Sequence, residues 1–334
     1  MSVQNVAAPP ILARGSGGLS RLFGSQVSSI SLVAIILAAY FEYRNTDFLT
    51  SDASLQNLSQ FVAPWTIIAC GEIMLMIGGE IDLSAGMVFA FAPFVMHFAV
   101  AAGLPPLAGV ILGVLAGGLV GLTNGLITVL LRIPSFVTTL GTLFLLNGIT
   151  LTLSRGTPVS PPGGEQFQAF FGNWGYSELL WALLVVAVMH VVLRNTRWGL
   201  HTIAAGANAH GAREAGINVA RLKIGNFVIV GLLAGLTGVL ECFRISSIDP
   251  QAGGTNVMFL AVAAGVIGGT PLAGGSGTII GGLVGAVVLG ILQDGLTMIG
   301  TNAFVFPTIL GAAILGAMVF NLHVTRLARG GARS

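Results

Sequence analysis

Residues 61–100 read FVAPWTIIACGEIMLMIGGEIDLSAGMVFAFAPFVMHFAV, two apolar runs separated by a short glycine-rich and acidic break. Each run is close to the roughly 20 apolar residues that a helix needs to cross a bilayer. The break at 79–84 carries two carboxylates, Glu80 and Asp82, where an unpaired charge is costly in lipid. The stretch therefore predicts two membrane-spanning helices joined by an irregular segment.

The whole chain shares this composition. Its 334 residues are 54% hydrophobic and 8% charged, whereas soluble domains average about 25% charged residues. This excludes a soluble enzyme and predicts an all-α, polytopic membrane protein with glycine-rich breaks. Apolar runs predict ten spans, at 28–42, 61–79, 84–103, 106–129, 134–153, 177–193, 224–243, 257–270, 278–298 and 303–321. The run at 257–270 is short, and a broken or re-entrant element formed with 278–298 is an alternative.

The distribution of basic residues indicates the orientation. With a cytoplasmic N-terminus, ten spans place only Arg44, Arg155 and Arg244 of the 14 basic residues outside. Cytoplasmic loops of membrane proteins carry such an excess of Arg and Lys. We therefore expect both termini in the cytoplasm. The expected organisation is a tail at 1–26, a transmembrane domain at 27–322 and a tail at 323–334, with outer loops at 43–60 and 154–176 and the largest inner loop at 194–223.

The break at 79–84 allows two interpretations. Asp82 or Ser84 would cap the following helix by accepting hydrogen bonds from its free N–H groups. Alternatively, the break lines the solute pathway, since irregular backbone at membrane depth is tolerated where it lines a cavity. Capping does not exclude a place in the pathway.

Other polar groups lie within or beside the apolar runs. Glu72, Glu241, His97 and His190 are either paired structurally or form a proton relay, because ionisable groups in spans are functional candidates. Cys70 and Cys242 are expected to be buried as small apolar residues, and no metal site is expected. Glycines recur every fourth residue at 113, 117, 121 and 125, and again at 277, 281 and 285. They indicate close helix packing within the chain, or alternatively a sliding or dimer surface.

The inner loop contains a short alanine-rich segment. Asn208 is placed to cap a helix that stops at Gly216, a favoured residue beyond a helix C-terminus. Such a helix fits a groove on a partner, or is an ordinary surface helix. The chain has no Gly-x-x-x-x-Gly-Lys-Ser/Thr motif, so it is not expected to bind or hydrolyse ATP. It also has no hydrolase motif that would indicate an intramembrane enzyme.

Four ordered motifs between about residues 55 and 321 carry a resemblance. They are residues 79–86 (GEIDLSAG), Asn124 followed by IPSFVTTLG at 133–141, residues 205–219 (AGANAHGAREAGINV) and residues 266–275 (VIGGTPLAGG). Together they resemble the permease subunits of ribose-type ABC importers. The chain departs from that family at Met258 and Leu260, where many members carry acids, and at Ser276, where a basic residue is common.

The resemblance implies a permease in the bacterial inner membrane that translocates a monosaccharide or related small polar solute and is not itself an enzyme. It implies a second permease copy (homodimer or heterodimer), a periplasmic binding protein and a separate ATPase that holds ATP and Mg; no nucleic acid partner is expected. The alternative is a proton-coupled secondary transporter. The implied ATPase-coupling residues are Gly206, Asn208, Arg213, Glu214, Gly216 and Asn218. The candidate pathway residues are Glu80, Asp82, Ser84, Asn124, Gly268, Gly269 and Thr270.

Overall fold

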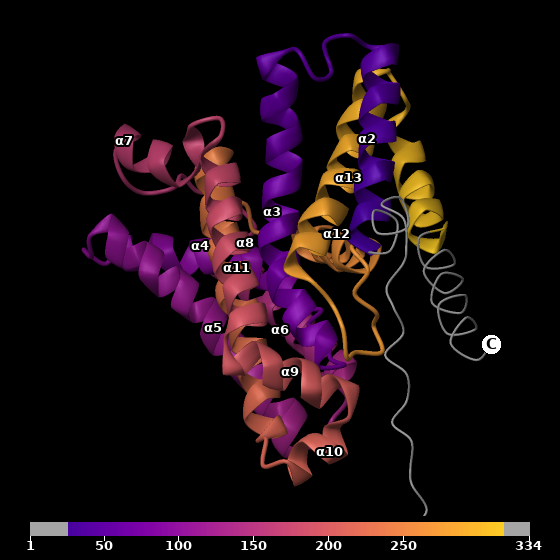
Figure 1. The fold of residues 1–334 in the computed structure, drawn as a ribbon. Helices are drawn as coiled ribbons and strands as arrows, with labels where there is room; N and C mark the ends of the chain where they lie inside the picture. The colour runs from indigo at the N-terminus through magenta and orange to yellow at the C-terminus, as the bar shows by residue number, and fades with distance from the viewer. Residues whose placement is uncertain (1–25, 317–334) are drawn as a thin grey trace, which may run out of the picture.

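The computed structural model describes residues 26–316, which form helices joined by turns and short loops (Figure 1). The predicted tails at 1–26 and 323–334 lie outside these residues, except for Gln26, where the first helix begins. Within the described residues the β-type pairing is limited to an isolated antiparallel bridge between Val159 and Ile248. The chain is all-α, as its composition predicts.

Seven described helices are long and apolar enough to cross a membrane, and three shorter apolar helices accompany them. The long helices are α2 (Gln26–Arg44), α3 (Asp52–Ile77), α5 (Pro106–Leu130), α6 (Ser135–Ser154), α8 (Ser177–Asn195), α11 (Val219–Arg244) and α13 (Ile279–Met298). The shorter ones are α4 (Ala85–Ala101), α12 (Gly254–Ile267) and Phe306–Gly316. The remaining elements are α7 (Glu165–Gln168), the π-helix η1 (Ala169–Asn173), α9 (Arg197–Ala207), α10 (Ala209–Glu214) and the 3-10 turn η2 (Ala303–Val305).

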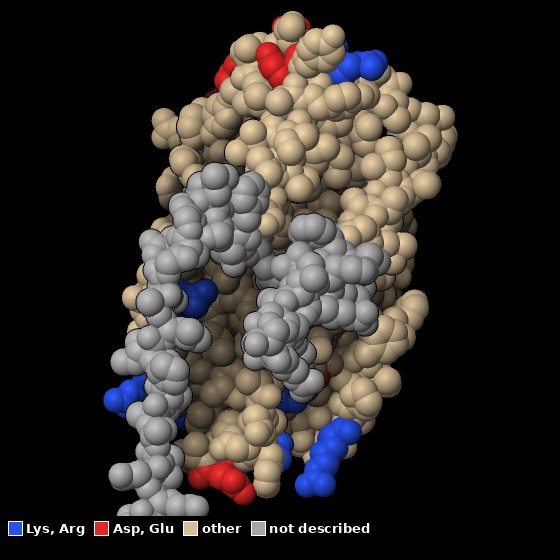
Figure 2. Space-filling view, turned by 45° about the vertical axis from the view of Figure 1, so that its right-hand side comes forward, with Lys and Arg blue, Asp and Glu red and all other residues tan. Residues whose placement is uncertain are grey.

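Exposed charged side chains gather at two ends of one face of the molecule. Figure 2 shows Asp, Glu, Lys and Arg side chains at the top and near the bottom of this face, and mainly other residues on the visible surface in between. In Figure 1, α9 and α10 lie at one end, and α7 and the connection from α2 to α3 lie at the other. The seven long apolar helices agree with the predicted polytopic membrane protein. The count of ten spans and the cytoplasmic placement of the termini stay predictions.

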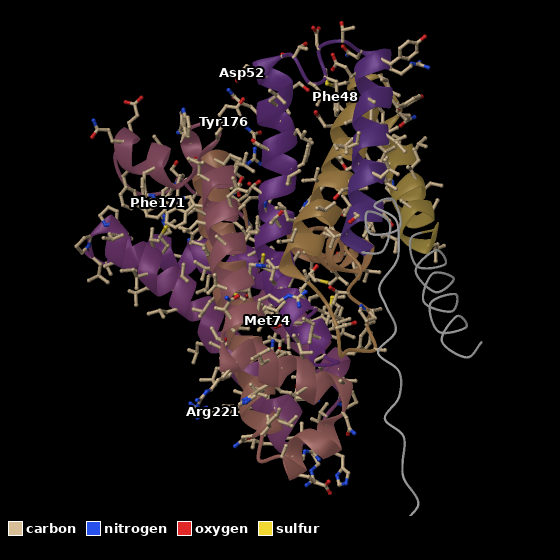
Figure 3. The ribbon with its side chains drawn as sticks, in the orientation of Figure 1. Phe48, Asp52, Met74, Phe171, Tyr176 and Arg221 are labelled. Atoms are coloured by element: carbon tan, nitrogen blue, oxygen red, sulfur yellow. The ribbon has the colours of Figure 1, made fainter. Side chains whose placement is uncertain are left out.

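Helix α3 is the centre of the bundle. Its apolar window is 89% buried, against 11% for that of α2, so α2 lies at the periphery. Helix α3 begins at Asp52, nine residues before the predicted span at 61–79 and inside the predicted outer loop at 43–60. Polar contacts hold its first turns: Ser54 Oγ donates to Phe48 O at 2.7 Å, and Tyr176 Oη donates to Asp52 Oδ1 at 2.6 Å. Figure 3 labels Phe48, Asp52 and Tyr176 at this end.

The glycines at 113, 117, 121 and 125 bring α5 against α4 and α11. A Cβ at Gly117 would lie 2.2 Å from Gly231 O, and one at Gly121 would lie 2.1 Å from Phe227 O. The glycines at 277, 281 and 285 also allow close packing. A Cβ at Gly285 in α13 would lie 2.1 Å from Ala264 O in α12. Small residues let helix backbones approach closely in membranes. Both stripes therefore pack closely against other helices of the same chain, as the first interpretation predicts.

Helix α12 is short for a membrane span. Its 14 residues measure about 21 Å, less than the roughly 30 Å of a bilayer core. A Cβ at Gly86 would lie 1.8 Å from Gly254 O, so α12 begins beside the start of α4. Its end packs on α13, where a Cβ at Gly268 would lie 2.3 Å from Gly281 O. This geometry favours the broken element over a simple span at 257–270.

Candidate translocation and coupling site

The break between α3 and α4 is closed by backbone hydrogen bonds. Gly79 N donates to Met76 O at 2.9 Å, and Glu80 N donates to Leu75 O at 3.1 Å. Gly79 has a φ of +76°, a conformation that glycine adopts without the steric cost that other residues meet. The paired glycines thus end α3 and direct the chain back into the protein.

Three predicted pathway residues meet just after this turn. Ser84 donates to Asp82 Oδ1 through its backbone N–H at 2.8 Å and its hydroxyl at 2.6 Å. Asn124 Nδ2 of α5 donates to Ser84 Oγ at 2.8 Å and to Asp82 Oδ2 at 3.3 Å. All three residues are at most 1% exposed. They form a buried polar network between the break and α5.

The network extends to α6 and α3. Thr142 Oγ1 of α6 donates to Asn124 Oδ1 at 2.6 Å. On the opposite side, Asp82 N donates to Glu72 Oε2 at 3.4 Å, while Glu72 Oε1 has no hydrogen-bond partner. Glu72 is fully buried. One set of hydrogen bonds therefore links α3, the break, α5 and α6.

The capping interpretation is only partly confirmed. Ser84 occupies the N-cap position of α4, but its side chain makes no capping hydrogen bond. Its hydroxyl is instead committed to Asp82 and Asn124. The backbone carbonyl of Ser84 accepts from Met87 N and Val88 N, both at 2.9 Å. The side chains of Asp82 and Ser84 thus belong to the network and not to a helix cap.

Glu80 points away from this network. Its Oε1 is ion-paired with Lys223 Nζ in α11. The structure thus divides the two carboxylates of the break: Asp82 faces the interior of the bundle, and Glu80 faces the first turns of α11.

The late glycine-rich segment lies beside the end of α3 and not in the Asp82 network. Gly275 N donates to Ile77 O at 2.9 Å. Gly269 has a φ of +90°, and Thr270 is fully buried with no hydrogen-bond partner for its hydroxyl. A cavity of about 270 Å³ adjoins this segment. Its lining includes Arg194, Gly268, Gly269, Ser276 and Thr278.

The inner loop folds into two helices, of which only the second is predicted. Asn208 caps α10 as predicted, because its Oδ1 accepts from Gly211 N at 3.0 Å. Gly216 follows α10 with a φ of +80°. Asn218 caps α11 by accepting from Arg221 N at 3.0 Å. Among the predicted coupling residues, Asn208, Arg213, Glu214, Gly216 and Asn218 are exposed.

Gly206 differs from the other predicted coupling residues. It lies in the last turn of α9 and packs against the end of α3, where a Cβ would lie only 1.7 Å from Ile77 O. It is therefore a contact between the inner loop and α3. The exposed surface of the loop is formed by α10 and the turn that follows.

Sequence reasoning missed one residue that joins the same elements. Asn226 in α11 donates through Nδ2 to Met74 O at 3.1 Å and accepts from Trp198 Nε1 at 2.8 Å. It is 2% exposed. An amide within an apolar span, three residues after the lone lysine, is the signal that was available in the sequence. Figure 3 labels Met74 on α3 and Arg221 near the start of α11.

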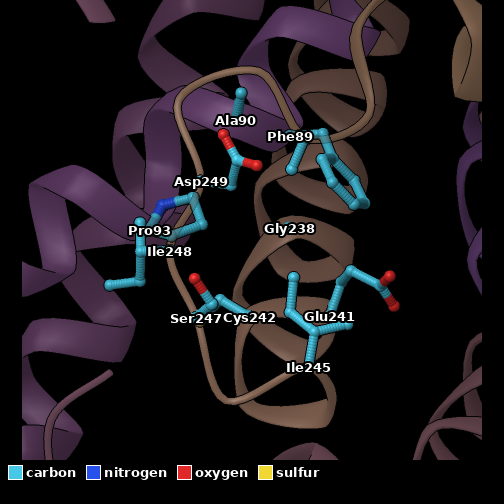
Figure 4. A pocket seen from close by; sticks show the side chains of 11 residues that line it. Phe89, Ala90, Pro93, Gly238, Glu241, Cys242, Ile245, Ser247, Ile248 and Asp249 are labelled. Atoms are coloured by element: carbon cyan, nitrogen blue, oxygen red, sulfur yellow. The ribbon is translucent and has the colours of Figure 1, made fainter. Parts of the chain in front are cut away.

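Arg244 is the centre of a separate charged cluster at the end of α11. Arg244 pairs with Glu241 and lies 3.5 Å from Glu178 Oε2, and its Nη1 donates to Gln60 Oε1 at 3.0 Å. This supports structural pairing for Glu241. Glu241 lines a small cavity between α4 and α11 (Figure 4). The volume of this cavity is about 10 Å³, room for roughly one water molecule. Cys70 and Cys242 are both free and buried, as predicted.

Comparison with known proteins identifies the class. Residues 54–322 match the family described as "Branched-chain amino acid transport system / permease component". Because the match covers most of the chain, the chain belongs to this family of multi-pass inner-membrane permease components. No solved structure matches the chain.

Curated relatives give a finer comparison. The xylose/arabinose import permease protein of Sulfolobus acidocaldarius is 36% identical over 88% of this chain and 84% of its own length. The ribose import permease protein of Escherichia coli is 34% identical over 86% of this chain and 92% of its own. The L-arabinose ABC transporter permease protein of Azospirillum brasilense is 33% identical over 93% of this chain and 91% of its own length. These similarities support the resemblance to sugar importers and not the proton-coupled alternative.

Proposed function

We propose that this chain is the membrane-spanning subunit of an ABC importer that carries a monosaccharide, with pentoses as the first candidates. The observation that carries this proposal is the similarity to relatives named for xylose, arabinose and ribose, each over most of both chains. The chain performs no chemistry on the solute. Its helices provide the path, and a separate subunit supplies the energy.

The inner loop supports an ATPase partner. The exposed residues Arg213, Glu214 and Gly216 present a small surface that a neighbouring groove can accept. In our proposal the ATPase holds ATP and Mg, a binding protein delivers the solute at the opposite end, and a second permease copy completes the path. The permease then alternates between outward and inward access as the ATPase closes and opens.

The two glycine-rich breaks support our proposal for where the solute crosses the helix bundle. A neutral sugar is recognised mainly through hydrogen-bonding groups. Asp82, Ser84 and Asn124 supply such groups between helices, and Gly268 and Gly269 border the cavity of about 270 Å³. In the described arrangement the network bonds to itself, so solute passage requires that its hydrogen bonds be exchanged.

A reconstituted transport assay tests the proposal. The full chain is co-purified with its ATPase, placed in liposomes and supplied with ATP and a loaded binding protein. Uptake of labelled ribose, arabinose and xylose is measured with and without a protonophore. We expect ATP-dependent uptake that the protonophore leaves unchanged. Absence of any ATPase complex, or uptake driven by a proton gradient without ATP, contradicts the proposal.

A further inference from the structure

One ion pair joins the inner loop to the break between α3 and α4. Lys223, the only lysine in the chain, lies near the start of α11 and pairs with Glu80. The side chains of Lys223 and Glu80 are 31% and 13% exposed, whereas the His210–Glu214 pair on α10 is 83% and 70% exposed. Opposite charges that are shielded from water attract each other more strongly than exposed ones. The electrostatic attraction within the Glu80–Lys223 pair is thus stronger than that within the exposed His210–Glu214 pair.

The lysine end of this link is coupled to α10 by packing. Ala205, Ala212, Val219 and Leu222 form one apolar cluster that joins α9, α10 and the start of α11. In addition, Ile217 N donates to Ala212 O at 2.9 Å. Because close-packed side chains transmit strain, a displacement of α10 acts on the first turns of α11.

The glutamate end is coupled to the buried network. Glu80 lies two residues before Asp82, and its own N–H is bonded to Leu75 O. Asp82 in turn holds Ser84 and accepts from Asn124. A shift of Glu80 is therefore transmitted to the break within two residues.

The last turn of α3 is held in place by contacts other than the Glu80–Lys223 ion pair. Asn226, one turn beyond Lys223, holds Met74 O, while Gly206 and Gly275 both contact Ile77 O. These contacts bind the last turn of α3 to α9, α11 and the late glycine-rich segment. Within the part of the chain that the structure describes, the break after Ile77 has no second hydrogen bond or ion pair to α11. Movement of the loop is thus directed into the break through Glu80.

We propose that the Glu80–Lys223 ion pair is the strut that transmits displacement of the inner loop to the Asp82–Ser84–Asn124 network. The inference rests on the proposed function, since it assumes an ATPase that moves α10. Glu80 and Lys223 are positioning residues: they act on the network and do not themselves belong to it.

The test uses the reconstituted complex and the amount of solute moved per ATP hydrolysed. The variants are Glu80→Ala, Lys223→Ala, the double alanine variant and the exchange E80K with K223E. Arg221→Ala is the matched control, because it removes an exposed basic side chain two residues away that makes no ion pair in the described structure. Assembly by size exclusion and ATP hydrolysis with loaded binding protein are recorded for each variant.

We expect each single alanine variant to assemble and to hydrolyse ATP, but to move about tenfold less solute per ATP. The double alanine variant should move as much solute per ATP as either single variant, because the effects of coupled residues are not additive. The charge exchange should restore a large part of the solute moved per ATP, because it re-forms the ion pair in the opposite direction. Lys223→Met keeps the apolar stem and replaces the alanine variant if the latter fails to fold.

Two results contradict this role of the ion pair. One is that the single alanine variants move as much solute per ATP as Arg221→Ala does. The other is that the exchange variant assembles but moves as little solute per ATP as the single variants. Failure of the proposed function is visible separately. In that case the unaltered chain itself forms no ATPase complex or shows no ATP-dependent uptake, before any variant is compared.

Discussion

Asp82 accepts hydrogen bonds from the backbone and hydroxyl of Ser84 and from the amide of Asn124. Buried polar groups in proteins are almost always satisfied in this way. The break singles out Asp82 and Ser84 in the sequence, because two carboxylates between apolar runs are unusual. The partnership with Asn124 is not visible there, since it depends on α5 returning antiparallel to α4.

Removal of the Asn124 amide tests this network. We expect Asn124→Ala to leave Asp82 and Ser84 with unmet hydrogen bonds and to lower the free energy of unfolding by about 1–3 kcal/mol. Thermal unfolding in detergent measures the change. Thr123→Ala is the control, since Thr123 is exposed and its hydroxyl bonds only to Leu119 O of its own helix. Equal melting temperatures for the two variants contradict the network's structural role.

The departures at Met258 and Leu260 have a local explanation. Both side chains are buried, at 1% and 2% exposure, within the main apolar cluster. A Cβ at Gly86 would lie 3.2 Å from Met258 Cβ, which places Met258 against the start of α4. Apolar side chains suit this position, and an acid there would need a partner.

Helix α5 and helix α6 use glycine differently. Gly117 in α5 faces the backbone of α11, whereas a Cβ at Gly148 in α6 would meet no atom within 4 Å. The spacing of glycines in the sequence predicts the close packing of α5. It does not show which partner helix is involved, because that depends on the tertiary arrangement.

This contrast gives a paired prediction. Gly117→Ala should lower the free energy of unfolding by about 1–3 kcal/mol, because the new methyl group collides with Gly231 O. Gly148→Ala has no such collision and should gain up to about 1 kcal/mol from its better helix propensity. Thermal unfolding of both variants checks the prediction. A destabilised Gly148→Ala variant, or an unaffected Gly117→Ala variant, contradicts it.

Helix α10 carries the predicted docking surface. We expect Arg213→Glu to weaken the complex with the ATPase by about tenfold, because Arg213 is exposed and a rim charge there acts on the partner. The apparent dissociation constant of the purified subunits is the measurement. Arg155→Glu, an exposed arginine after α6 in the predicted outer loop, is the control. If both variants bind the ATPase alike, the docking surface lies elsewhere.

Element boundaries show what hydropathy reveals and what it leaves out. Most apolar spans are located within a few residues, because burial in lipid requires apolar side chains. The start of α3 was missed by nine residues, since its first turns are polar and are held by contacts to Phe48 and Tyr176. Helix α9 was missed because it is amphipathic and packs through Trp198 and Thr202, which a search for apolar runs does not detect.

At the scale of the whole molecule, orientation is the central prediction. The native cysteines are buried, so an introduced exposed cysteine should be the main target of a membrane-impermeant maleimide. We expect His210→Cys in α10 to react only when the cytoplasmic side is accessible, as in inverted vesicles. Gln166→Cys in α7 should react from outside in intact cells, because the positive-inside distribution places it there. The reverse pattern contradicts the predicted topology.

The single lysine has one more consequence. Since Lys223 carries the only side-chain amine in the chain, amine-directed reagents have one side-chain target in it. An isotope label introduced by methylation of that amine, which keeps its positive charge, therefore reports on one defined position beside Glu80. The chain carries a built-in site for observing, during turnover, whether its two charges stay together.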